Sequence, residues 1–218
     1  MPSAFTLPSR LYAILDIDLT RARGLEPLAV CEAWLDAGVR LIQIRAKTIG
    51  SGEFLDLADA CAQRTRAAGA TFVVNDRADI AAMAHADGVH VGQDDLPARA
   101  ARTLVGPDAI VGLSTHSDAQ LDAGCAEPVS YLAIGPVYST STKRSTNATV
   151  GLEGVTRAAA RARGATRPLV AIGGITMSEA PSVIEAGADA VAVISDLLDA
   201  DIGARARRYL KALEGLPL

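Results

Sequence analysis

Acidic side chains follow two apolar segments of the sequence, at the point where each segment ends. Asn75 and Asp76 close TFVVND, and Asp94 and Asp95 follow GVHVGQ. A carboxylate at the end of a buried segment is costly unless a cation pairs with it. Mg²⁺ accepts one or two carboxylates together with water and phosphate oxygens, so these segments predict a magnesium site held by Asp76 and Asp95. We expect Asp94 to face solvent or to cap the helix that begins near Pro97, with a contact to the magnesium ion as the alternative.

Basic and amide side chains alternate in the segment LIQIRAK. Gln43, Arg45 and Lys47 point the same way if the extended backbone continues through all three residues. Two cations and an amide on one side of a strand suit an anionic ligand. The alternative is that Arg45 and Lys47 pair with acidic residues of neighbouring strands.

Hydroxyl groups and glycines follow four later apolar segments. GLSTHS places Ser114 at the end of its segment, where the hydroxyl can donate a hydrogen bond, and AIGGI supplies two glycines that let the backbone approach a ligand closely. AVIS ends in Ile194 and Ser195. Within GPVYSTSTK, three hydroxyl residues and a cation suit a phosphate or diphosphate: Thr140, Ser141, Thr142 and Lys143. The alternative is a flexible Ser/Thr loop with no function.

Two histidines near these motifs give less evidence of a catalytic role. His116 follows Ser114 and is expected either to support the ligand-binding groups or only to pack, while His90 lies inside an apolar segment and is expected to be a hydrogen-bonded interior residue. The sequence indicates neither a Ser-His-Asp nucleophile nor a lysine buried among apolar neighbours.

The apolar segments that carry these groups number eight and are mostly apolar at consecutive positions, as in strands covered on both faces. Ala-rich segments with helical spacing separate them. This pattern predicts the α/β class, with residues 1–218 forming a single (β/α)8 TIM-barrel domain. A doubly wound open sheet is the alternative, but no glycine-rich dinucleotide motif follows the first segment. The expected strands cover residues 11–16, 41–45, 71–76, 88–92, 110–114, 131–137, 168–175 and 190–195.

In such a barrel the carboxyl ends of the strands share one mouth, where active sites lie. Two anionic groups are therefore expected there. One would lie with the magnesium ion, Arg45, Lys47 and Lys143, and the other on the backbone amides of Gly173-Gly174 and Ser195.

Composition excludes several classes of protein. A net charge of −4 and a pI near 5.4 argue against a nucleic-acid-binding face. Three widely spaced cysteines form neither a disulfide framework nor a zinc motif. The N-terminal segment lacks the pattern of a signal peptide, and no stretch reaches the ~20 apolar residues that span a membrane. A cytoplasmic location is expected, and whether copies of the chain form a homo-oligomer is left open.

Seven of these motifs, in this order and spacing, resemble those of the thiamine phosphate synthase family: QIRAK, VVND, GVHVGQDDLP, GLSTH, GPVYSTSTK, AIGGI and AVIS. The resemblance covers nearly the whole chain. It implies a transferase that joins 4-amino-2-methyl-5-hydroxymethylpyrimidine diphosphate to 4-methyl-5-hydroxyethylthiazole phosphate. Diphosphate would leave first, and the thiazole nitrogen would then attack the resulting pyrimidine methylene cation.

The resemblance also implies roles for individual residues. Asp76 and Asp95 would bind Mg²⁺, since the family's metal pair has the same separation (95 − 76 = 19). Gln43 through Lys47, with Asn75, would hold the pyrimidine diphosphate, Ser114 would meet the pyrimidine amine, and Lys143 would meet the diphosphate. Arg45, Lys47, Lys143 and Ser114 would be the catalytic set. The thiazole phosphate would be held by Thr140, Ser141, Thr142, Gly174, Ile194 and Ser195.

Two departures from the family pattern, Ala46 and Tyr138-Ser139, remove no ligand. Two other functions are compatible with part of this pattern. A related thiazole tautomerase would share the barrel and the thiazole phosphate site, and a non-catalytic regulator would only bind a phosphorylated ligand. Neither needs the combined set of Asp76, Asp95, Lys47 and Lys143.

Overall fold

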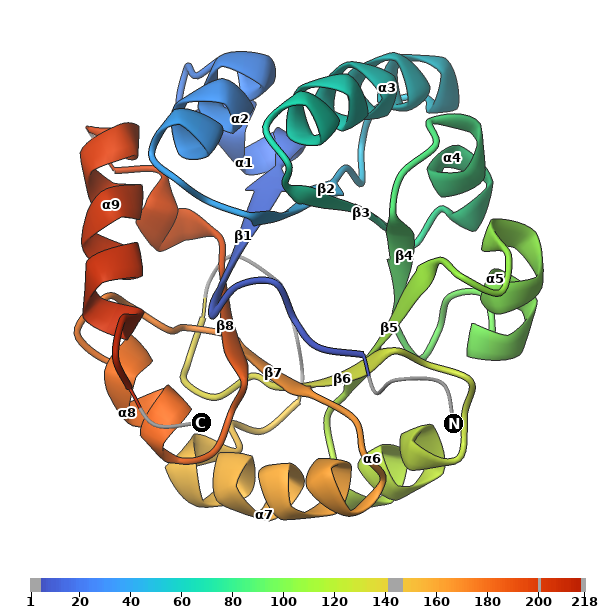
Figure 1. Cartoon of the computed structure of the whole chain (residues 1–218), viewed down its shortest axis with the longest axis vertical. Coiled ribbons are helices and arrows are strands. Elements are labelled where there is room, and N and C mark those ends of the chain that lie inside the picture. The colour runs from blue at the N-terminus through green and yellow to red at the C-terminus, as the bar shows by residue number, and fades with distance from the viewer. Residues whose placement is uncertain (1–4, 141–146, 200, 217–218) are drawn as a thin grey trace.

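Eight parallel strands close on themselves in the computed structural model, which describes residues 5–140, 147–199 and 201–216. Each strand pairs with the next one along the chain, and the last returns to the first through pairs such as Leu11 with Val191. Figure 1 looks down this barrel. The predicted (β/α)8 TIM-barrel architecture is confirmed. The strands are β1 (Leu11–Asp16), β2 (Leu41–Arg45), β3 (Thr71–Asn75), β4 (Gly88–Val91), β5 (Ile110–Thr115), β6 (Tyr131–Ile134), β7 (Leu169–Ile172) and β8 (Ala190–Val193).

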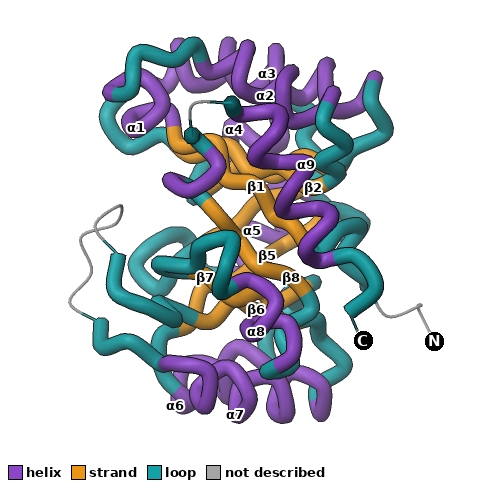
Figure 2. The backbone as a smooth tube through the Cα atoms, turned by 90° about the vertical axis from the view of Figure 1, so that its left-hand side faces the viewer, coloured by secondary structure: helices purple, strands orange, loops and turns teal. Residues whose placement is uncertain are grey.

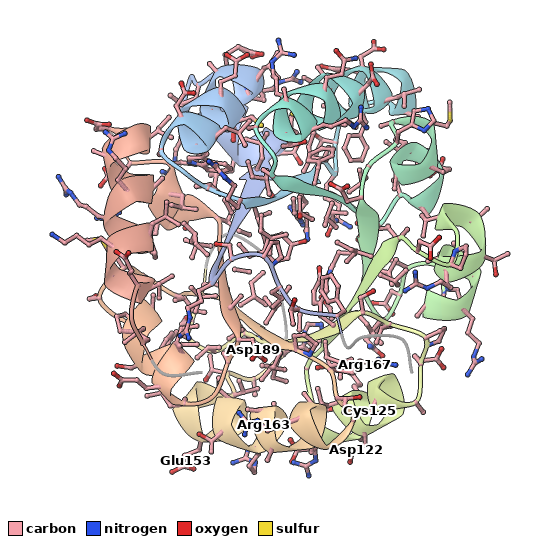
Figure 3. The ribbon with its side chains drawn as sticks, viewed as in Figure 1. Asp122, Cys125, Glu153, Arg163, Arg167 and Asp189 are labelled. Atoms are coloured by element: carbon pink, nitrogen blue, oxygen red, sulfur yellow. The ribbon has the colours of Figure 1, made fainter. Side chains whose placement is uncertain are left out.

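Helices surround the barrel on its outer side, as the view in Figure 2 also shows. Each packs an apolar face against the strands. In the helix after β6, for example, Val155 and Ala158 are buried, while Glu153 and Arg163 point away from the barrel (Figure 3). The helices are α1 (Ile17–Ala22), α2 (Pro27–Asp36), α3 (Ser51–Ala67), α4 (Ala78–Met83), α5 (Ala98–Val105), α6 (Asp118–Cys125), α7 (Gly151–Gly164), α8 (Ala180–Glu185) and α9 (Ile202–Leu213), with a short 3-10 turn, η1 (Ser195–Leu197), after β8.

Side chains alternate between two cores along each strand. Leu11, Ala13 and Leu15 of β1 belong to the core between barrel and helices, whereas Tyr12 and Ile14 fill the barrel interior. Because successive side chains of a strand point to opposite faces, every second residue faces inward up to the mouth. The same alternation places polar side chains inside at the carboxyl ends of β1 to β5: Asp16, Gln43, Arg45, Asn75, His90 and Ser114.

Several strands end earlier than the sequence suggests, because the residues after them leave the sheet. The backbone of Asp76 is left-handed, with φ of 62°, so β3 stops at Asn75. Gly173 and Gly174 have φ of 102° and 67° and likewise end β7 at Ile172. The expected extensions of these strands are instead loops at the mouth of the barrel.

Candidate active site

The ends of β1 and β2 carry a buried ion pair. Asp16 is 3% exposed and pairs with Arg45, while its other carboxylate oxygen accepts a hydrogen bond from the Leu19 amide at 2.9 Å and so caps α1. The pair fixes the guanidinium at the mouth of the barrel. Sequence analysis missed Asp16, although LYAILD ends in a carboxylate just as TFVVND does.

Lys47 lies in the same region, although the extended strand that was expected to carry it ends before it. The strand β2 ends at Arg45, and the backbone of Lys47 is held outside it by a hydrogen bond from its amide to Asp18, at 3.0 Å. Its ammonium group pairs with Asp76. Both cations therefore contact acids of neighbouring strands, as one of the two interpretations of LIQIRAK predicted, and both still lie at the mouth.

Asp76 and Asp95 meet at the ends of β3 and β4. The carboxyl group of Asp95 lies close enough to that of Asp76 to disfavour its ionisation. The Asp76 amide donates to the His90 carbonyl oxygen at 2.7 Å, and Asp95 accepts from the Gly92 amide at 2.8 Å, so the backbone aims both groups. Burial raises the pKa of Asp76 above its ordinary value, the adjacent Asp95 raises it further, and Lys47 only partly opposes both effects.

Two adjacent carboxylates of this kind suit a divalent cation. Within the described residues no group of three or more His, Cys, Asp or Glu side chains could hold a metal, so an ion bound here would keep other oxygen ligands. Mg²⁺ has this preference. Asp94 is exposed, and no side chain caps α5, so the expected alternative of a helix cap does not apply to it.

A cavity of about 360 Å³ opens on the other side of the mouth, at the ends of β5 to β8. Its lining includes seven residues that the sequence singled out: Ser114, His116, Thr140, Gly173, Gly174, Ile194 and Ser195. It also includes Arg23, which follows α1 and donates to the carbonyl oxygens of Ser195 at 3.0 Å and Leu198 at 2.6 Å. Arg23 had no sequence signal, because it lies in a loop with no motif around it.

Glycines shape the wall of this cavity. A Cβ on Gly174 would lie 2.5 Å from the Ser139 carbonyl oxygen, and one on Gly173 would lie 2.6 Å from Pro136. Hydrogen bonds of 2.9 Å from the Val137 amide to Ile172 and from the Tyr138 amide to Gly173 hold the loops after β6 and β7 together. Only glycine fits where the two backbones come this close.

A smaller cavity of about 60 Å³ continues into the barrel interior. Gln43, Arg45, Asn75 and His90 line it, and it shares Ser114 with the larger cavity. The nitrogen Nε2 of His90 lies 2.8 Å from the Ser114 hydroxyl oxygen. His90 is thus the satisfied interior residue that was predicted, but its contact with Ser114 was not foreseen. His116 also lines the larger cavity, with Nδ1 2.6 Å from the Gly135 carbonyl oxygen.

A sequence model of the family described as Thiamine monophosphate synthase matches residues 11–197. The chain belongs to this family. It is 44% identical over 218 residues to the thiamine-phosphate synthase of Koribacter versatilis, covering 98% of this chain and 99% of the relative. It is 46% identical over 193 residues to that of Acidothermus cellulolyticus, covering 88% of each chain.

A solved structure of the thiamine phosphate pyrophosphorylase from Pyrococcus furiosus superposes with a TM-score of 0.84 at 29% identity, over 95% of this chain and 96% of that one. The resemblance to the thiamine phosphate synthase family, and with it the expectation of an enzyme of the transferase class, is confirmed. Within the described part of the chain, every helix is too short or too polar to span a bilayer.

Three residues assigned by resemblance to this family lie outside the described residues: Ser141, Thr142 and Lys143. Their roles stay predictions. Of the remaining assigned residues, the structure brings all to the mouth of the barrel: Gln43, Arg45, Asn75 and Ser114 line the small cavity, Lys47, Asp76 and Asp95 form the charged cluster, and Thr140, Gly174, Ile194 and Ser195 line the large cavity.

Proposed function

We propose that this chain catalyses the Mg²⁺-dependent condensation of 4-amino-2-methyl-5-hydroxymethylpyrimidine diphosphate with 4-methyl-5-hydroxyethylthiazole phosphate. The products are thiamine phosphate and diphosphate. The observation that carries the proposal is the adjacency of two regions whose groups suit anions. Charged side chains cluster at the ends of β2 to β4, and a glycine-walled cavity of about 360 Å³ adjoins them. A reaction that joins a diphosphate to a phosphate ester needs both.

The charged cluster of Lys47, Asp76 and Asp95, together with Arg45, would bind the pyrimidine diphosphate. Arg45 and Lys47 are held at the mouth by Asp16 and Asp76, and a diphosphate would add negative charge beside two cations that are already ordered. Asp76 and Asp95 would hold Mg²⁺, which when bound neutralises charge on the departing diphosphate. Lys143 would contribute a further cation to this group.

The thiazole phosphate would occupy the larger cavity. Backbone amides near Gly174 and Ser195, together with Thr140, Ser141 and Thr142, would receive its phosphate group. This position would place the thiazole ring over the shared wall at Ser114 and Ile194, next to the small cavity where the pyrimidine would lie.

The proposed reaction is dissociative. The bond between the pyrimidine methylene carbon and the diphosphate oxygen breaks, both electrons leave with diphosphate, and the amino group of the ring stabilises the cation. The lone pair of the thiazole nitrogen then forms the new C–N bond. The tasks of the protein are to position the two substrates and to complement the charge of the leaving group.

The test is a coupling assay with purified protein, both substrates, and either magnesium or EDTA, in which thiamine phosphate is followed by its fluorescent oxidation product. We expect product with magnesium and none with EDTA. Folded protein that forms no product with magnesium would contradict the proposed function and favour the tautomerase or regulatory alternatives. Equal rates in EDTA would contradict the role of the metal.

The cytoplasmic location and the possibility of a homo-oligomer stay predictions. The three cysteines are free, with Cys31 and Cys61 buried, which agrees with a reducing compartment. Cell fractionation and the mass of the purified protein in solution test these two predictions.

A further inference from the structure

A chain of hydrogen bonds crosses the barrel interior beneath the small cavity. Gln43 Nε2 donates to the Tyr12 hydroxyl at 2.8 Å, and the Tyr12 and Tyr131 hydroxyls are 3.0 Å apart. Tyr131 lies 2.8 Å from His90 Nδ1, and His90 Nε2 lies 2.8 Å from the Ser114 hydroxyl. Five strands contribute one residue each. The chain therefore connects two residues assigned to the pyrimidine site, Gln43 and Ser114, through three buried side chains.

Packing holds the three middle residues in place. Tyr12 and Tyr131 are each 1% exposed and His90 is 8% exposed. The rings of His90 and Tyr131 stack with centroids 5.5 Å apart, and Tyr12 meets Tyr131 edge-on. A Cβ on Gly112 would lie 2.2 Å from the Tyr131 ring and 2.5 Å from His90 Nδ1. The absence of a side chain at Gly112 makes room for this pair.

The direction of the hydrogen bonds follows from counting protons. An amide nitrogen can only donate, so the Tyr12 oxygen accepts from Gln43 and its own hydrogen is directed to Tyr131. Tyr131 accepts that hydrogen and directs its own to His90 Nδ1. A neutral imidazole that accepts at Nδ1 carries its hydrogen on Nε2, and this hydrogen is donated to Ser114. Of the three hydroxyl groups in this series of hydrogen bonds, those of Tyr12 and Tyr131 then donate to a neighbour within the series. The Ser114 hydroxyl is left to donate toward the cavity.

Both phenols keep their hydrogens in this arrangement. Burial raises the pKa of Tyr12 and of Tyr131 well above the ordinary value, so both are neutral donors at physiological pH. A contact between serine and histidine also occurs in hydrolases, where the imidazole accepts the serine proton. With the hydrogens directed as above, the roles are reversed, since Nε2 would carry a hydrogen and could not act as the base for Ser114.

We infer that His90 is a positioning residue that fixes Ser114 as a hydrogen-bond donor toward the pyrimidine substrate, through a relay of hydroxyl groups that begins at Gln43. The inference rests on the proposed function for the identity of the substrate, but the direction of the relay does not depend on it. The Ser114 hydrogen would meet a ring nitrogen of the pyrimidine rather than the amino group that the family resemblance implies, because that amino group is itself a donor. It would contribute to substrate binding rather than to bond breaking.

Two substitutions of His90 separate its two contacts. His90→Gln retains an N–H donor within reach of Ser114, whereas His90→Asn retains only a group that can accept from Tyr131. We expect His90→Asn to raise KM for the pyrimidine diphosphate about tenfold, the effect of one lost hydrogen bond, and His90→Gln to raise it about threefold or less. KM for the thiazole phosphate should change in neither variant. Equal effects of the two substitutions, or a parallel rise of both KM values, would overturn the inference.

A double-mutant cycle tests whether His90 acts through Ser114. In a Ser114→Ala background, His90→Asn should have little further effect on KM for the pyrimidine diphosphate, because the group that it orients is gone. If His90 were instead a base that activates Ser114, both single substitutions would lower kcat by about 100-fold or more and leave KM unchanged. That outcome would also overturn the inference.

The relay itself is tested with Tyr131→Phe, which removes the hydroxyl that donates to His90 Nδ1. Thr65→Val is a matched control, since Thr65 is a buried hydroxyl on α3 that donates to the Cys61 carbonyl oxygen at 2.9 Å, away from the site. We expect Tyr131→Phe to raise KM for the pyrimidine diphosphate about threefold, and Thr65→Val to leave it unchanged. An unchanged KM in Tyr131→Phe would show that the relay does not orient Ser114.

Nitrogen-15 NMR of the histidines in the ligand-free protein decides the direction without any activity measurement. Above the ordinary histidine pKa of about 6.5, the His90 signals, assigned by their loss in His90→Gln, should show the hydrogen on Nε2. A hydrogen on Nδ1 would overturn the inference even if the coupling assay succeeds. The expected tautomer in a protein that forms no thiamine phosphate would instead place the failure in the proposed function.

Discussion

The two sides of the barrel mouth differ in the groups that they would offer to the proposed anionic substrates. At the ends of β1 to β4, cationic side chains are already paired with acids, Arg45 with Asp16 and Lys47 with Asp76. At the ends of β6 to β8, the wall is built from Gly173, Gly174 and the start of η1. The first side offers charge on side chains, and the second offers backbone that a ligand can approach closely.

Because of this difference, the two sides should tolerate different substitutions. A side that works by charge loses its function when a charge is removed, even if the shape is kept. A side that works by close approach of the backbone loses its function when a single methyl group is added, even if no charge changes. Substitutions that respect one requirement and violate the other therefore test the comparison.

The largest effect is expected on the charged side. Asp76→Ala and Asp95→Ala should each lower kcat/KM by about 100-fold or more, because the proposed magnesium ion would lose one of its two carboxylate ligands. Asp94→Ala is the matched control, since this neighbouring carboxylate is exposed, and it should stay within about twofold of the wild type. Coupling assays over a magnesium titration measure all three. Near-normal activity in both Asp76→Ala and Asp95→Ala, with intact circular dichroism, would contradict the metal assignment.

On the glycine side, Gly174→Ala should raise KM for the thiazole phosphate about tenfold or more and leave KM for the pyrimidine diphosphate nearly unchanged. The added Cβ would meet Ser139 O at 2.5 Å, and the φ of +67° is unfavourable for alanine. Gly164→Ala is the control, because a Cβ there meets nothing within 4 Å. Steady-state kinetics with each substrate varied in turn provides the measurement. A rise in KM for both substrates would mean that the two sides of the mouth are not separate sites.

A smaller effect on catalysis is expected where one charged residue supports another. Asp16→Asn keeps an oxygen that can cap α1 but leaves Arg45 without its anionic partner. We expect the free energy of unfolding to fall by about 3 kcal/mol, as when a buried ion pair loses one member, and KM for the pyrimidine diphosphate to rise severalfold. Urea denaturation and kinetics measure the two effects. Adding Arg45→Met should restore part of the stability; no recovery would mean that Asp16 stabilises the fold mainly through α1.

The comparison also explains how much of the site could be predicted from the sequence. The sequence could place four charged residues at the mouth, because charged side chains stand out at the ends of apolar segments: Asp76, Asp95, Arg45 and Lys47. Gly174 was found because a glycine pair after a strand is typical of a phosphate site. The eight strands were found for a similar reason, since buried parallel strands are continuous apolar segments.

The residues that were missed have roles that depend on partners distant in the sequence. Asp16 matters because β1 lies beside β2, and Tyr12 and Tyr131 matter because they meet inside the barrel, 119 positions apart along the chain. Tyr12 and Tyr131 look like ordinary apolar members of their strands. The ends of β7 and β8 were predicted too far along the chain, because apolar residues continue into the loops that form the cavity.

The smallest predicted effect concerns the stability of the charged side without a metal. The pKa of Asp76 is raised by burial and by Asp95, so the folded state holds this proton more tightly than the unfolded chain does. Stability therefore falls as the pH rises from the ordinary carboxyl value, about 4, through the raised pKa. Asp76→Asn removes this cost. In EDTA at neutral pH we expect Tm to rise by about 2 °C, with the gain shrinking as the pH is lowered.

Asp95→Asn separates charge relief from a backbone effect. Asparagine also favours the left-handed conformation that Asp76 adopts, with φ of 62°, so a gain in Asp76→Asn alone could reflect the backbone. Asp95→Asn removes the same repulsion and retains an oxygen for the Gly92 amide. If repulsion between the two carboxylates is the cause, both substitutions should raise Tm in EDTA. Saturating magnesium should then make the wild type the most stable of the three, because only the wild type would hold the proposed ion with two carboxylates. A rise in Tm that occurs only in Asp76→Asn and does not depend on pH would contradict the charge explanation. It would mean that the left-handed backbone at residue 76, and not repulsion between carboxylates, destabilises the charged side.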